Sequence, residues 1–449
     1  MDGNVLPSKL LSVLSKAADI VRSHGFIQVY THYDADGLSS AGIIANMLLR
    51  AGKEFQITTF KTLNAENLRI ILDCDSDCVL IADLGASYIK ELDESDKEII
   101  VLDHHTVRDE ATRIAYANPH LYGVDGMVGA CGATMSFLLS VTMDERNWDL
   151  VQIAFGGIVG DKQHLNGLTG FNTYLLDEGV KRGFIKVMQG SMIPSGPLVD
   201  SLFSCTDPYI KGITGNRENI LRMLKDADIP EESSFITLTE DEKRRLSSMI
   251  AVKLTQQGVT SEVMRELTKT RYYLMGWSMD AESFTELMDA CGRLLFQGLG
   301  VSICLGDRDA LVEAMGIRDE YNKDILNSTL ELDEKGLVQR EHIQYFDSSE
   351  SGYSGVIAGI AMRYFADPNK PTIAMNSSET KVKISSRGTN SLLDKGLDLS
   401  TAMYESCKAV GGEGGGHRIA SGGSFDCGRE EEFIDVVDKI VGEQFRSSK

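Results

Sequence analysis

Short apolar runs alternate with longer amphipathic segments over residues 10–190. The short runs predict buried strands at 26–31, 55–60, 78–82 and 99–102. The segment 38–50 predicts a helix directly after the first strand, because its apolar residues recur at helical spacing. The run 151–159 fits a buried helix or a strand, and we favour a helix. This alternation predicts a parallel sheet with helices on both faces.

The pattern changes twice further along the chain. Residues 191–340 carry long charged helical patterns, such as 240–257 and 281–295, with 298–305 as a candidate strand. A second, smaller α/β pattern follows, with helices expected at 354–365 and 430–445 and strands at 371–375 and 380–385. We therefore expect an N-terminal parallel-sheet domain (1–190), a helical connecting or inserted region (191–340) and a C-terminal α/β domain (341–449).

Composition narrows the classes of protein that this chain can represent. Its 449 residues suffice for two or three domains, and 42% hydrophobic with 25% charged residues is ordinary for a globular protein. No apolar run approaches the ~20 residues of a membrane span, and the N-terminus lacks the features of a signal peptide. We expect a cytoplasmic protein without membrane contact. The net charge of −21 argues against coating nucleic acid through bulk electrostatics, but bound divalent cations would reverse the charge locally.

The first polar motif comes where the first predicted strand ends. His32, Asp34 and Asp36 alternate at a spacing of two, so in an extended segment all three side chains face one cavity. Gly37 lets the chain turn, and a helix from Leu38 would direct its first amide groups at the same cavity. Alone, such a motif is more often an exposed acidic turn. Three further motifs of the same kind make a functional role the better interpretation.

The companion motifs follow further apolar runs. Asp83 follows 78–82, Asp103-His104-His105 follows 99–102, and Asp161 follows 151–159. Carboxyl ends of parallel strands share one edge of the sheet, so the first three motifs are expected to converge there, and Asp161 closes the set after a glycine-rich turn. Asp83 is placed to bridge two cations, although a loop or helix-cap aspartate is the alternative. Of two adjacent histidines, one binds a cation while the other contacts a phosphoryl oxygen or holds a carboxylate.

Carboxylate and imidazole ligands suit Mn²⁺, with Mg²⁺ or Co²⁺ as alternatives. Two such ions between a phosphate and a water molecule make a phosphoesterase. A glycine run in the C-terminal region, Gly414-Gly415-Gly416-His417, would let backbone amides approach a phosphate, with nearby lysine and arginine side chains supplying charge. A glycine-rich surface loop is the alternative, because isolated glycine motifs have low specificity.

The four motifs resemble, in order, those of the DHH phosphoesterase superfamily over most of residues 1–190. The glycine run with Ser421-Gly422-Gly423, and the segment Lys383-Ile384-Ser385-Ser386-Arg387, resemble the associated DHHA1 domain. The two domains in this order are similar to the archaeal RecJ-like branch, whose members include nucleases associated with GINS-type replication complexes. The resemblance implies a two-cation site in the first domain and substrate binding in the second.

The resemblance also implies individual roles. The expected metal ligands are His32, Asp34, Asp36, Asp83, His105 and Asp161. Some members carry a histidine four residues before the first aspartate, where this chain has Tyr30, so either His32 takes over or one cation site is weaker. The expected catalytic residues are His104, beside the scissile phosphate, with Asp103 and Asp83. The expected substrate-binding residues are Lys383, Ser385, Arg387, Gly414, Gly415, Gly416, His417 and Arg418.

The leading functional hypothesis is a metal-dependent exonuclease on single-stranded DNA or RNA, with 5′ to 3′ polarity by analogy, acting in replication or repair. The alternatives are a phosphodiesterase for oligoribonucleotides or cyclic dinucleotides, and a GINS-binding replication subunit whose main role is binding. The last alternative follows from the similarity of this branch to a eukaryotic replicative helicase subunit that keeps the fold without catalysis. The intact set of aspartates and histidines argues for an enzyme.

Overall fold

The computed structural model describes residues 6–107, 109–165, 167–188, 192–194, 196–268, 270–349 and 352–447. The chain forms two compact units, Met1–Ser191 with Thr268–Asp319, and Met192–Leu267 with Glu320–Lys449. The predicted boundary at 190/191 lies outside the described residues, and the region 191–340 contributes to both units. The division into three domains therefore stays a prediction. None of the helices in the described ranges is long and apolar enough to cross a membrane.

The first unit is built on a five-stranded sheet of order β2-β1-β3-β4-β5, in which every neighbouring pair is parallel. The strands are β1 (Phe26–His32), β2 (Glu54–Phe60), β3 (Cys78–Ala82), β4 (Glu98–Leu102) and β5 (Ala115–Ala117). The four strands expected from the apolar runs are confirmed. Because all pairs are parallel, the carboxyl ends of β1, β3 and β4 lie along one edge of the sheet.

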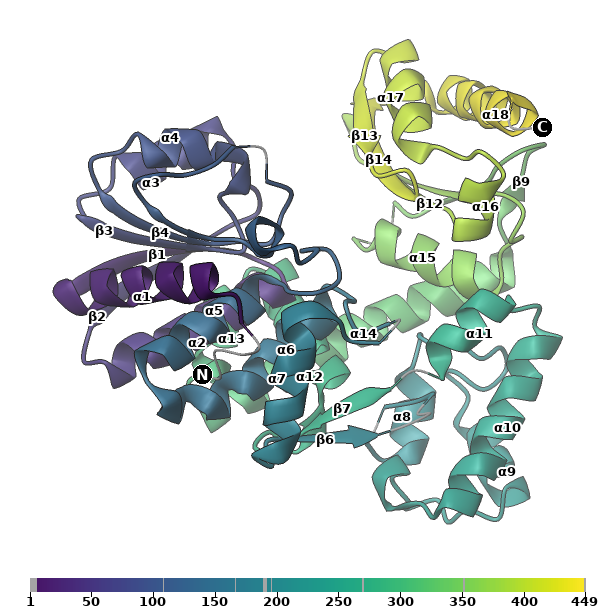
Figure 1. Ribbon diagram of the computed structural model, residues 1–449. Helices are drawn as coiled ribbons and strands as arrows, with labels where there is room; N and C mark the ends of the chain where they lie inside the picture. Colours follow the sequence, from purple (N-terminus) through teal and green to yellow (C-terminus); the bar gives the residue numbers. More distant parts are fainter. Residues whose placement is uncertain are drawn as a thin grey trace. The chain divides into compact units, whose positions relative to one another are not determined.

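Helices cover both faces of this sheet (Figure 1). One face packs against α1 (Ser8–Ser23), α2 (Ala35–Arg50), α5 (Gly132–Met143) and α6 (Val151–Gly160), and the other against α3 (Ala65–Leu72) and α4 (Ile89–Asp93). Successive strand residues point to opposite faces, so Leu80 lies in the first core and Ile81 in the second. The predicted helix at 151–159 is confirmed. This two-sided burial explains why the strands are continuous apolar runs rather than alternating ones.

The first unit is completed by α7 (Gly170–Lys181), the short sheet β6-β7-β8 (Ile185–Met188, Arg271–Leu274, Met279–Asp280), α12 (Ala281–Arg293) and α13 (Gln297–Cys304). The strand expected at 298–305 is wrong, because this segment is α13. Its buried residues Gly300, Ile303 and Cys304 have helical spacing, and they pack on α12 and α2. The helix α14 (Arg308–Lys335) has residues in both units.

The second unit combines helices with a six-stranded mixed sheet of order β13-β14-β12-β11-β10-β9. The strands are β9 (Val338–Gln339), β10 (Gln344–Asp347), β11 (Thr372–Ser377), β12 (Lys381–Arg387), β13 (Glu413–Gly416) and β14 (Ala420–Asp426). The helices are α8 (Leu198–Ser204), α9 (Arg217–Asp226), α10 (Glu240–Gln256), α11 (Ser261–Leu267), α15 (Ser354–Tyr364), α16 (Asn390–Asp394), α17 (Leu399–Ala409) and α18 (Glu430–Ser447). Within this unit, α15 covers one face of the sheet and α17 and α18 the other (Figure 1). The predicted α/β fold class is confirmed.

Candidate metal centre and substrate face

The first motif lies where β1 passes into α2. Asp34 is the N-cap of α2, and its Oδ1 accepts a hydrogen bond of 3.1 Å from the N–H of Gly37. The extended geometry expected for the whole motif is wrong for Asp36, because the helix begins at Ala35 instead of Leu38. This helical turn separates Asp36 from Asp34. His32 and Asp34 therefore belong to one group of side chains, and Asp36 belongs to another.

Asp36 is held by the N-terminus of α5. Its Oδ2 accepts from the N–H of Gly132 at 2.7 Å, and its Oδ1 from the N–H of Ala133 at 2.9 Å. A Cβ on Gly157 of α6 would lie 2.2 Å from Asp36 Oδ1, so a glycine is required for this close approach. Burial, and then the neighbouring carboxylate of Asp83, raise the pKa of Asp36 to about 7.

Asp83 lies between two imidazole rings at the end of β3. Its φ of 56° is unusual for a residue with a side chain, which is typical of strained positions at functional sites. Oδ1 lies 3.2 Å from Nε2 of His104, and Oδ2 lies 3.5 Å from Nδ1 of His32. Burial acts to raise the pKa of Asp83, but the contacts with His104 and His32 outweigh it and hold the pKa well below its usual range.

Backbone carbonyls fix the far nitrogen of each of these histidines. His32 Nε2 lies 3.1 Å from the carbonyl oxygen of Lys61, and His104 Nδ1 lies 2.8 Å from that of Gly126. A carbonyl only accepts, so each of these nitrogens carries a proton and the opposite nitrogen faces the carboxylates. Burial lowers the pKa of His32, but Asp34 and Asp83 outweigh it and raise it to about 11. The carboxylates thus attract positive charge to this site, whether a proton or a metal ion carries it.

Asp161 completes the second group of side chains. It is the C-cap of α6, and its Oδ2 lies 3.3 Å from His104 Nε2. Burial and the carboxylate of Asp36 raise the pKa of Asp161 well above its ordinary value. The same Nε2 lies 3.8 Å from Asp36 Oδ2. The three carboxylates Asp36, Asp83 and Asp161 therefore surround one imidazole nitrogen, and they outweigh burial to raise the pKa of His104.

Three overlapping sets of donor atoms result: His32 with Asp34 and Asp83, Asp36 with His104 and Asp161, and Asp83 with Asp103, His104 and His105. Within each set the donor atoms lie within 4.8 Å of one another. Carboxylate oxygen and imidazole nitrogen fit Mn²⁺ and similar divalent ions. Asp83 belongs to two of these sets and contacts His104 of the set that contains Asp36 and Asp161, which agrees with the bridging position expected from the sequence. The residues present therefore fit a site for two divalent cations.

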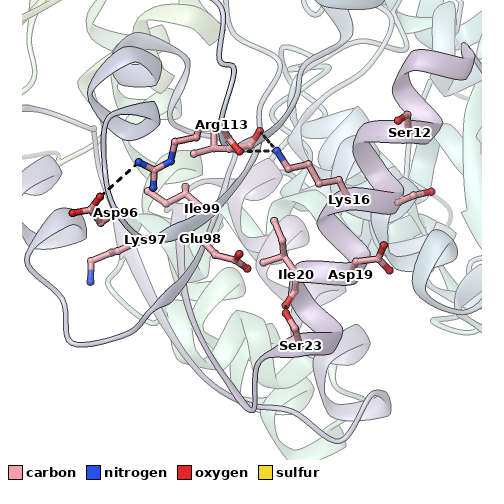
Figure 2. Close-up of a pocket in the computed structure, with 12 residues that line it drawn as sticks. Ser12, Lys16, Asp19, Ile20, Ser23, Asp96, Lys97, Glu98, Ile99 and Arg113 are labelled. Carbon is pink, nitrogen blue, oxygen red and sulfur yellow. Dashed lines mark hydrogen bonds and ion pairs between the residues drawn. The ribbon is translucent and has the colours of Figure 1, made fainter.

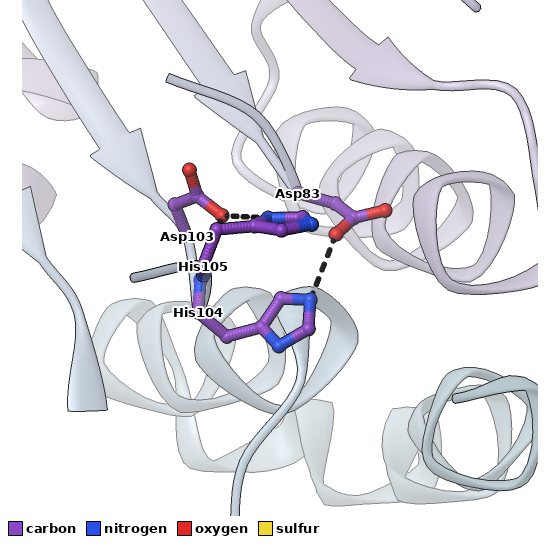
Figure 3. A group of neighbouring side chains, drawn as sticks. All are labelled: Asp83, Asp103, His104 and His105. Atoms are coloured by element: carbon purple, nitrogen blue, oxygen red, sulfur yellow. Dashed lines mark hydrogen bonds and ion pairs between the residues drawn. The ribbon is translucent and has the colours of Figure 1, made fainter. Parts of the chain in front are cut away.

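The two histidines of the central motif have different surroundings. His104 Nε2 lies 3.2 Å from Asp83 Oδ1, whereas His105 Nδ1 lies 2.8 Å from Asp103 Oδ1. The side chain of His105 is 52% exposed, and both rings share a donor set with Asp83 (Figure 3). Asp103 Oδ1 accepts hydrogen bonds from the N–H groups of His104 at 2.7 Å and His105 at 3.2 Å, and it lies 2.8 Å from His105 Nδ1. The other oxygen, Oδ2, accepts from the N–H of Ala86 at 2.7 Å. Asp103 thus holds the backbone of His104 and His105 in place. The sequence-based assignment, with His105 as a metal ligand and His104 beside the phosphate, stays a prediction. His105 shares a donor set with Asp83, Asp103 and His104, and His104 also faces Asp36 and Asp161.

Several residues of the site were missed by sequence reasoning. Asp289 of α12 accepts from the N–H of Ala35 at 3.2 Å, and a Cβ on Gly292 would lie 1.9 Å from the carbonyl oxygen of Tyr33. The charged pattern of α12 resembles that of a solvated helix and gives no signal for this contact. Asn118 Nδ2 donates to the carbonyl of His105 at 3.0 Å. The Asn118-Pro119 pair after β5 is a turn signal that could have identified it.

In the second unit, part of the predicted substrate-binding set shares one face of the sheet. Lys383, Ser385 and Arg387 alternate along β12 and therefore point to the same side. Gly415 of β13 belongs to this face too, because Gly422 of β14 pairs with both Gly415 and Ser385. A Cβ on Gly355, in the first turn of α15, would lie 2.8 Å from Arg387 Nη2. Two cationic side chains, a hydroxyl and a helix N-terminus suit a phosphate group.

The other predicted substrate-binding residues are placed differently. The glycine run is an edge strand, in which a Cβ on Gly414 would lie 2.4 Å from the carbonyl of Met403 in α17, on the opposite face. Gly416 has a φ of 138°, which favours glycine. His417 lies exposed in the turn after β13. Arg418 Nε lies 3.7 Å from Asp398 Oδ2 at the start of α17. Gly414 is thus required by its close contact with α17 and Gly416 by its backbone conformation, whereas Gly415 leaves open space on the face of Lys383.

A hollow of about 820 Å³ in the first unit lies away from the metal centre (Figure 2). It lies between α1 and the start of β4, where Lys16 donates to the carbonyl of Arg113 at 2.6 Å and Arg113 Nη1 lies 3.7 Å from Asp96. Asp96 and Arg113 precede the strands β4 and β5, whereas Asp83 follows β3 and Asp103 follows β4. The hollow is therefore at the opposite edge of the parallel sheet.

Comparison with known proteins agrees with this architecture. Residues 26–158 match the family model described as the DHH family, N-terminal domain, and residues 342–443 match the DHHA1 domain. An uncharacterized protein of Methanocaldococcus jannaschii is 32% identical over 436 residues, covering 95% of this chain and 96% of that protein. This chain therefore belongs to the DHH family and carries a C-terminal DHHA1 domain.

Solved structures share the fold across both units. An exonuclease RecJ bound to manganese superimposes with a TM-score of 0.60 at 16% identity, covering 97% of this chain and 95% of that one. CDC45 from Entamoeba histolytica gives a TM-score of 0.64 at 13% identity, covering 96% of this chain and 99% of that one. At such identities the likeness establishes the fold alone.

Proposed function

We propose that this protein is a metal-dependent exonuclease that hydrolyses phosphodiester bonds of single-stranded DNA or RNA. The observation that carries the proposal is the overlap of these donor sets around Asp83, which faces His32 with one oxygen and His104 with the other. Two divalent cations bound there would polarise the scissile phosphate and activate a water molecule. The RecJ structures with which this chain shares its fold contain Mn²⁺ or Mg²⁺, which supports the same choice of ion here.

In this proposal the residues have distinct tasks. His32, Asp34 and Asp83 hold one cation, and Asp36, His104, Asp161 and Asp83 hold the other. His105 contacts the phosphate instead of a cation. Its Nδ1 is engaged by Asp103, which raises the pKa of His105 against the effect of burial. The protonated Nε2 of His105 then donates a hydrogen bond to a phosphoryl or leaving oxygen.

The second unit would hold the rest of the nucleic-acid strand. Lys383, Ser385 and Arg387 offer two positive charges and a hydroxyl on one face, and the bare backbone of Gly415 allows a phosphate to approach. Nothing within 4 Å surrounds the position of a Cβ on Gly415. Contacts of this kind are made to phosphate and sugar and not to bases, so we expect little sequence preference.

The test is an end-labelled cleavage assay in Mn²⁺ with a long single-stranded DNA, a matched RNA and a dinucleotide, beside Asp83→Ala. Stepwise shortening of the long strands that disappears in Asp83→Ala is the expected result, and the label shows the polarity. Cleavage of the dinucleotide alone would overturn the exonuclease in favour of a phosphodiesterase for short substrates. Absence of metal-dependent cleavage of all three would overturn the enzyme and favour a binding role in a replication complex of the GINS type.

A further inference from the structure

A row of buried polar side chains lies behind His104 in the first unit. Thr134 of α5, Asn172 of α7 and Gln163, in the segment between α6 and α7, are 0%, 0% and 3% exposed, and His104 is 5% exposed. Buried polar groups destabilise a fold unless they are hydrogen-bonded. Each of the four side chains bonds to the next group in the row. Because this continuous row contacts a ligand of the metal centre, we expect it to orient that ligand as well as to fill the core.

The direction of every hydrogen bond in this row is determined from one end. Gln163 lies against two backbone carbonyls, of Gly126 at 2.9 Å and of Ala130 at 3.2 Å, and these only accept. Its amide nitrogen must therefore face them, and its oxygen accepts from Asn172 Nδ2 at 2.7 Å. The Asn172 oxygen in turn accepts from the hydroxyl of Thr134 at 2.6 Å. Turning the amide of Asn172 around would break two of these hydrogen bonds, and turning that of Gln163 would break three.

The row ends on the carbonyl that orients His104. The oxygen of Gly126 accepts from Gln163 Nε2 and also from His104 Nδ1 at 2.8 Å. A Cβ on Gly126 would lie 2.0 Å from the carbonyl oxygen of His104, so these two backbone segments are in direct contact. Because Nδ1 donates to this carbonyl, Nε2 is the His104 nitrogen that faces Asp83 and Asp161 and that a bound cation would use.

We propose that Gln163 is a positioning residue, which fixes the Gly126 carbonyl and thereby sets the tautomer and direction of His104 for cation binding. Thr134 and Asn172 act through Gln163 by fixing the orientation of its amide. This inference rests on the proposed function, because it assigns His104 as a ligand. It adds a residue outside the DHH motifs whose role is exerted through a backbone carbonyl.

The test is Gln163→Met, which keeps the length of the side chain and removes its hydrogen bonds. Mn²⁺ affinity is measured from the electron paramagnetic resonance signal of free Mn²⁺ in a titration. Loss of an outer-shell partner weakens metal affinity by roughly 10- to 100-fold, and we expect a decrease in this range. In ¹⁵N-histidine spectra, assigned with His104→Gln, the wild type should show one hydrogen-bonded Nδ1–H signal for His104, and the variant several or a broadened one.

Gln152→Met is the matched control. Gln152 is a buried glutamine of α6, whose amide bonds the N–H of Gly276 at 2.6 Å and the carbonyl of Asp149 at 3.1 Å. This substitution should lower the melting temperature and leave both Mn²⁺ affinity and the His104 signal unchanged. Equal Mn²⁺ affinity of Gln163→Met and the control would overturn the inference while leaving the proposed function intact. A wild-type protein that binds no Mn²⁺ would instead refute the metal centre itself.

Thr134→Val decides the question if Gln163→Met does not fold, as judged by circular dichroism. Valine keeps the shape of threonine and removes only the hydroxyl that orients Asn172. We expect a smaller decrease in Mn²⁺ affinity and the same kind of change in the His104 signal. A folded Thr134→Val with wild-type affinity and an unchanged His104 signal would overturn the proposed row.

Discussion

Asp83 directs its two carboxylate oxygens at two different histidines, with Oδ1 3.2 Å from His104 Nε2 and Oδ2 3.5 Å from His32 Nδ1. Replacing one oxygen by an amide, in Asp83→Asn, removes a ligand from one set and puts a donor where an acceptor is needed. We expect at least a ~100-fold loss of cleavage, since even outer-shell changes reach that size. Titration calorimetry with Mn²⁺ should show fewer bound ions. Asp149→Asn, which changes an exposed carboxylate paired with Arg50, should leave stoichiometry and cleavage unchanged.

The adjacent histidines His104 and His105 should separate metal binding from catalysis. His104→Ala removes a nitrogen that faces three carboxylates, so Mn²⁺ affinity and cleavage should fall together. His105→Ala should leave Mn²⁺ affinity within about threefold and lower kcat by roughly 10²- to 10⁴-fold, as expected for a lost proton donor. Affinity titrations and cleavage rates on both variants make the comparison. The opposite pattern would restore the assignment first expected from the sequence, with His105 as the ligand.

Gly157 is predicted to be essential to the position of Asp36. In Gly157→Ala the new methyl group would lie 2.2 Å from Asp36 Oδ1 and 2.6 Å from Ala133 Cβ, so α6 or Asp36 must move. We expect a lower melting temperature, by several degrees for a cost of about 1–3 kcal/mol from overpacking, together with weaker Mn²⁺ binding. Gly298→Ala in α13, where nothing lies within 4 Å of the added carbon, is the control and should keep Mn²⁺ affinity. Unchanged Mn²⁺ binding in Gly157→Ala would contradict the placement of Asp36 in the site.

Arg387 and Arg418 should differ in their effect on substrate binding. Arg387 lies on the face shared by Lys383 and Ser385, whereas Arg418 lies near Asp398 at the start of α17. Arg387→Gln should raise KM for single-stranded substrate, leave Mn²⁺ affinity unchanged, and reduce the slope of log affinity against log salt by about one. Arg418→Gln should change these quantities less. Binding measured by fluorescence anisotropy at several salt concentrations makes the comparison, and equal effects would show that both arginines contact the strand.

The sequence predicted the parts of the site that follow directly from strand ends. Asp83 and Asp103 each come immediately after a continuous apolar run, and a parallel sheet necessarily brings such positions to one edge. Which of His104 and His105 faces the carboxylates of Asp36 and Asp161 was not predictable, because that depends on backbone and side-chain torsions after β4. The extended spacing assumed for Asp36 failed because the helix starts three residues earlier than its apolar pattern indicates.

Contacts between distant segments also escaped sequence reasoning. Asp289 reaches Ala35 across 254 positions of sequence, and Gln163 reaches Gly126 through a carbonyl that has no sequence signature. The segment 298–305 was mistaken for a strand because a short apolar run fits either structure, and its burial on α2 decides in favour of a helix. In the second unit, the glycine run indicated phosphate binding, but only the register shows that Gly414 and Gly415 face opposite sides.

The carboxylate of Asp93 is expected to make the stability of the first unit depend on pH. Burial acts to raise its pKa, but hydrogen bonds from the N–H groups of Thr112, Arg113 and Ile114 and the hydroxyl of Thr112 outweigh it and lower the pKa to about 2. A carboxyl whose pKa is lower in the folded than in the unfolded state stabilises the fold above its ordinary pKa of 3.8. That stabilisation is lost as the pH falls toward 2.

Asp93→Asn should therefore lower the free energy of unfolding by a constant amount between pH 7 and 5, and by less at pH 4 and 3. The two tryptophans of the chain, Trp148 and Trp277, both lie in the first unit, so their fluorescence in urea reports on this unit. Asp96→Asn, which changes a fully exposed carboxylate three residues away, is the control and should have little effect at any pH. A difference between wild type and Asp93→Asn that stays the same at every pH would contradict the lowered pKa, because the lost stability would then come from hydrogen bonding without charge.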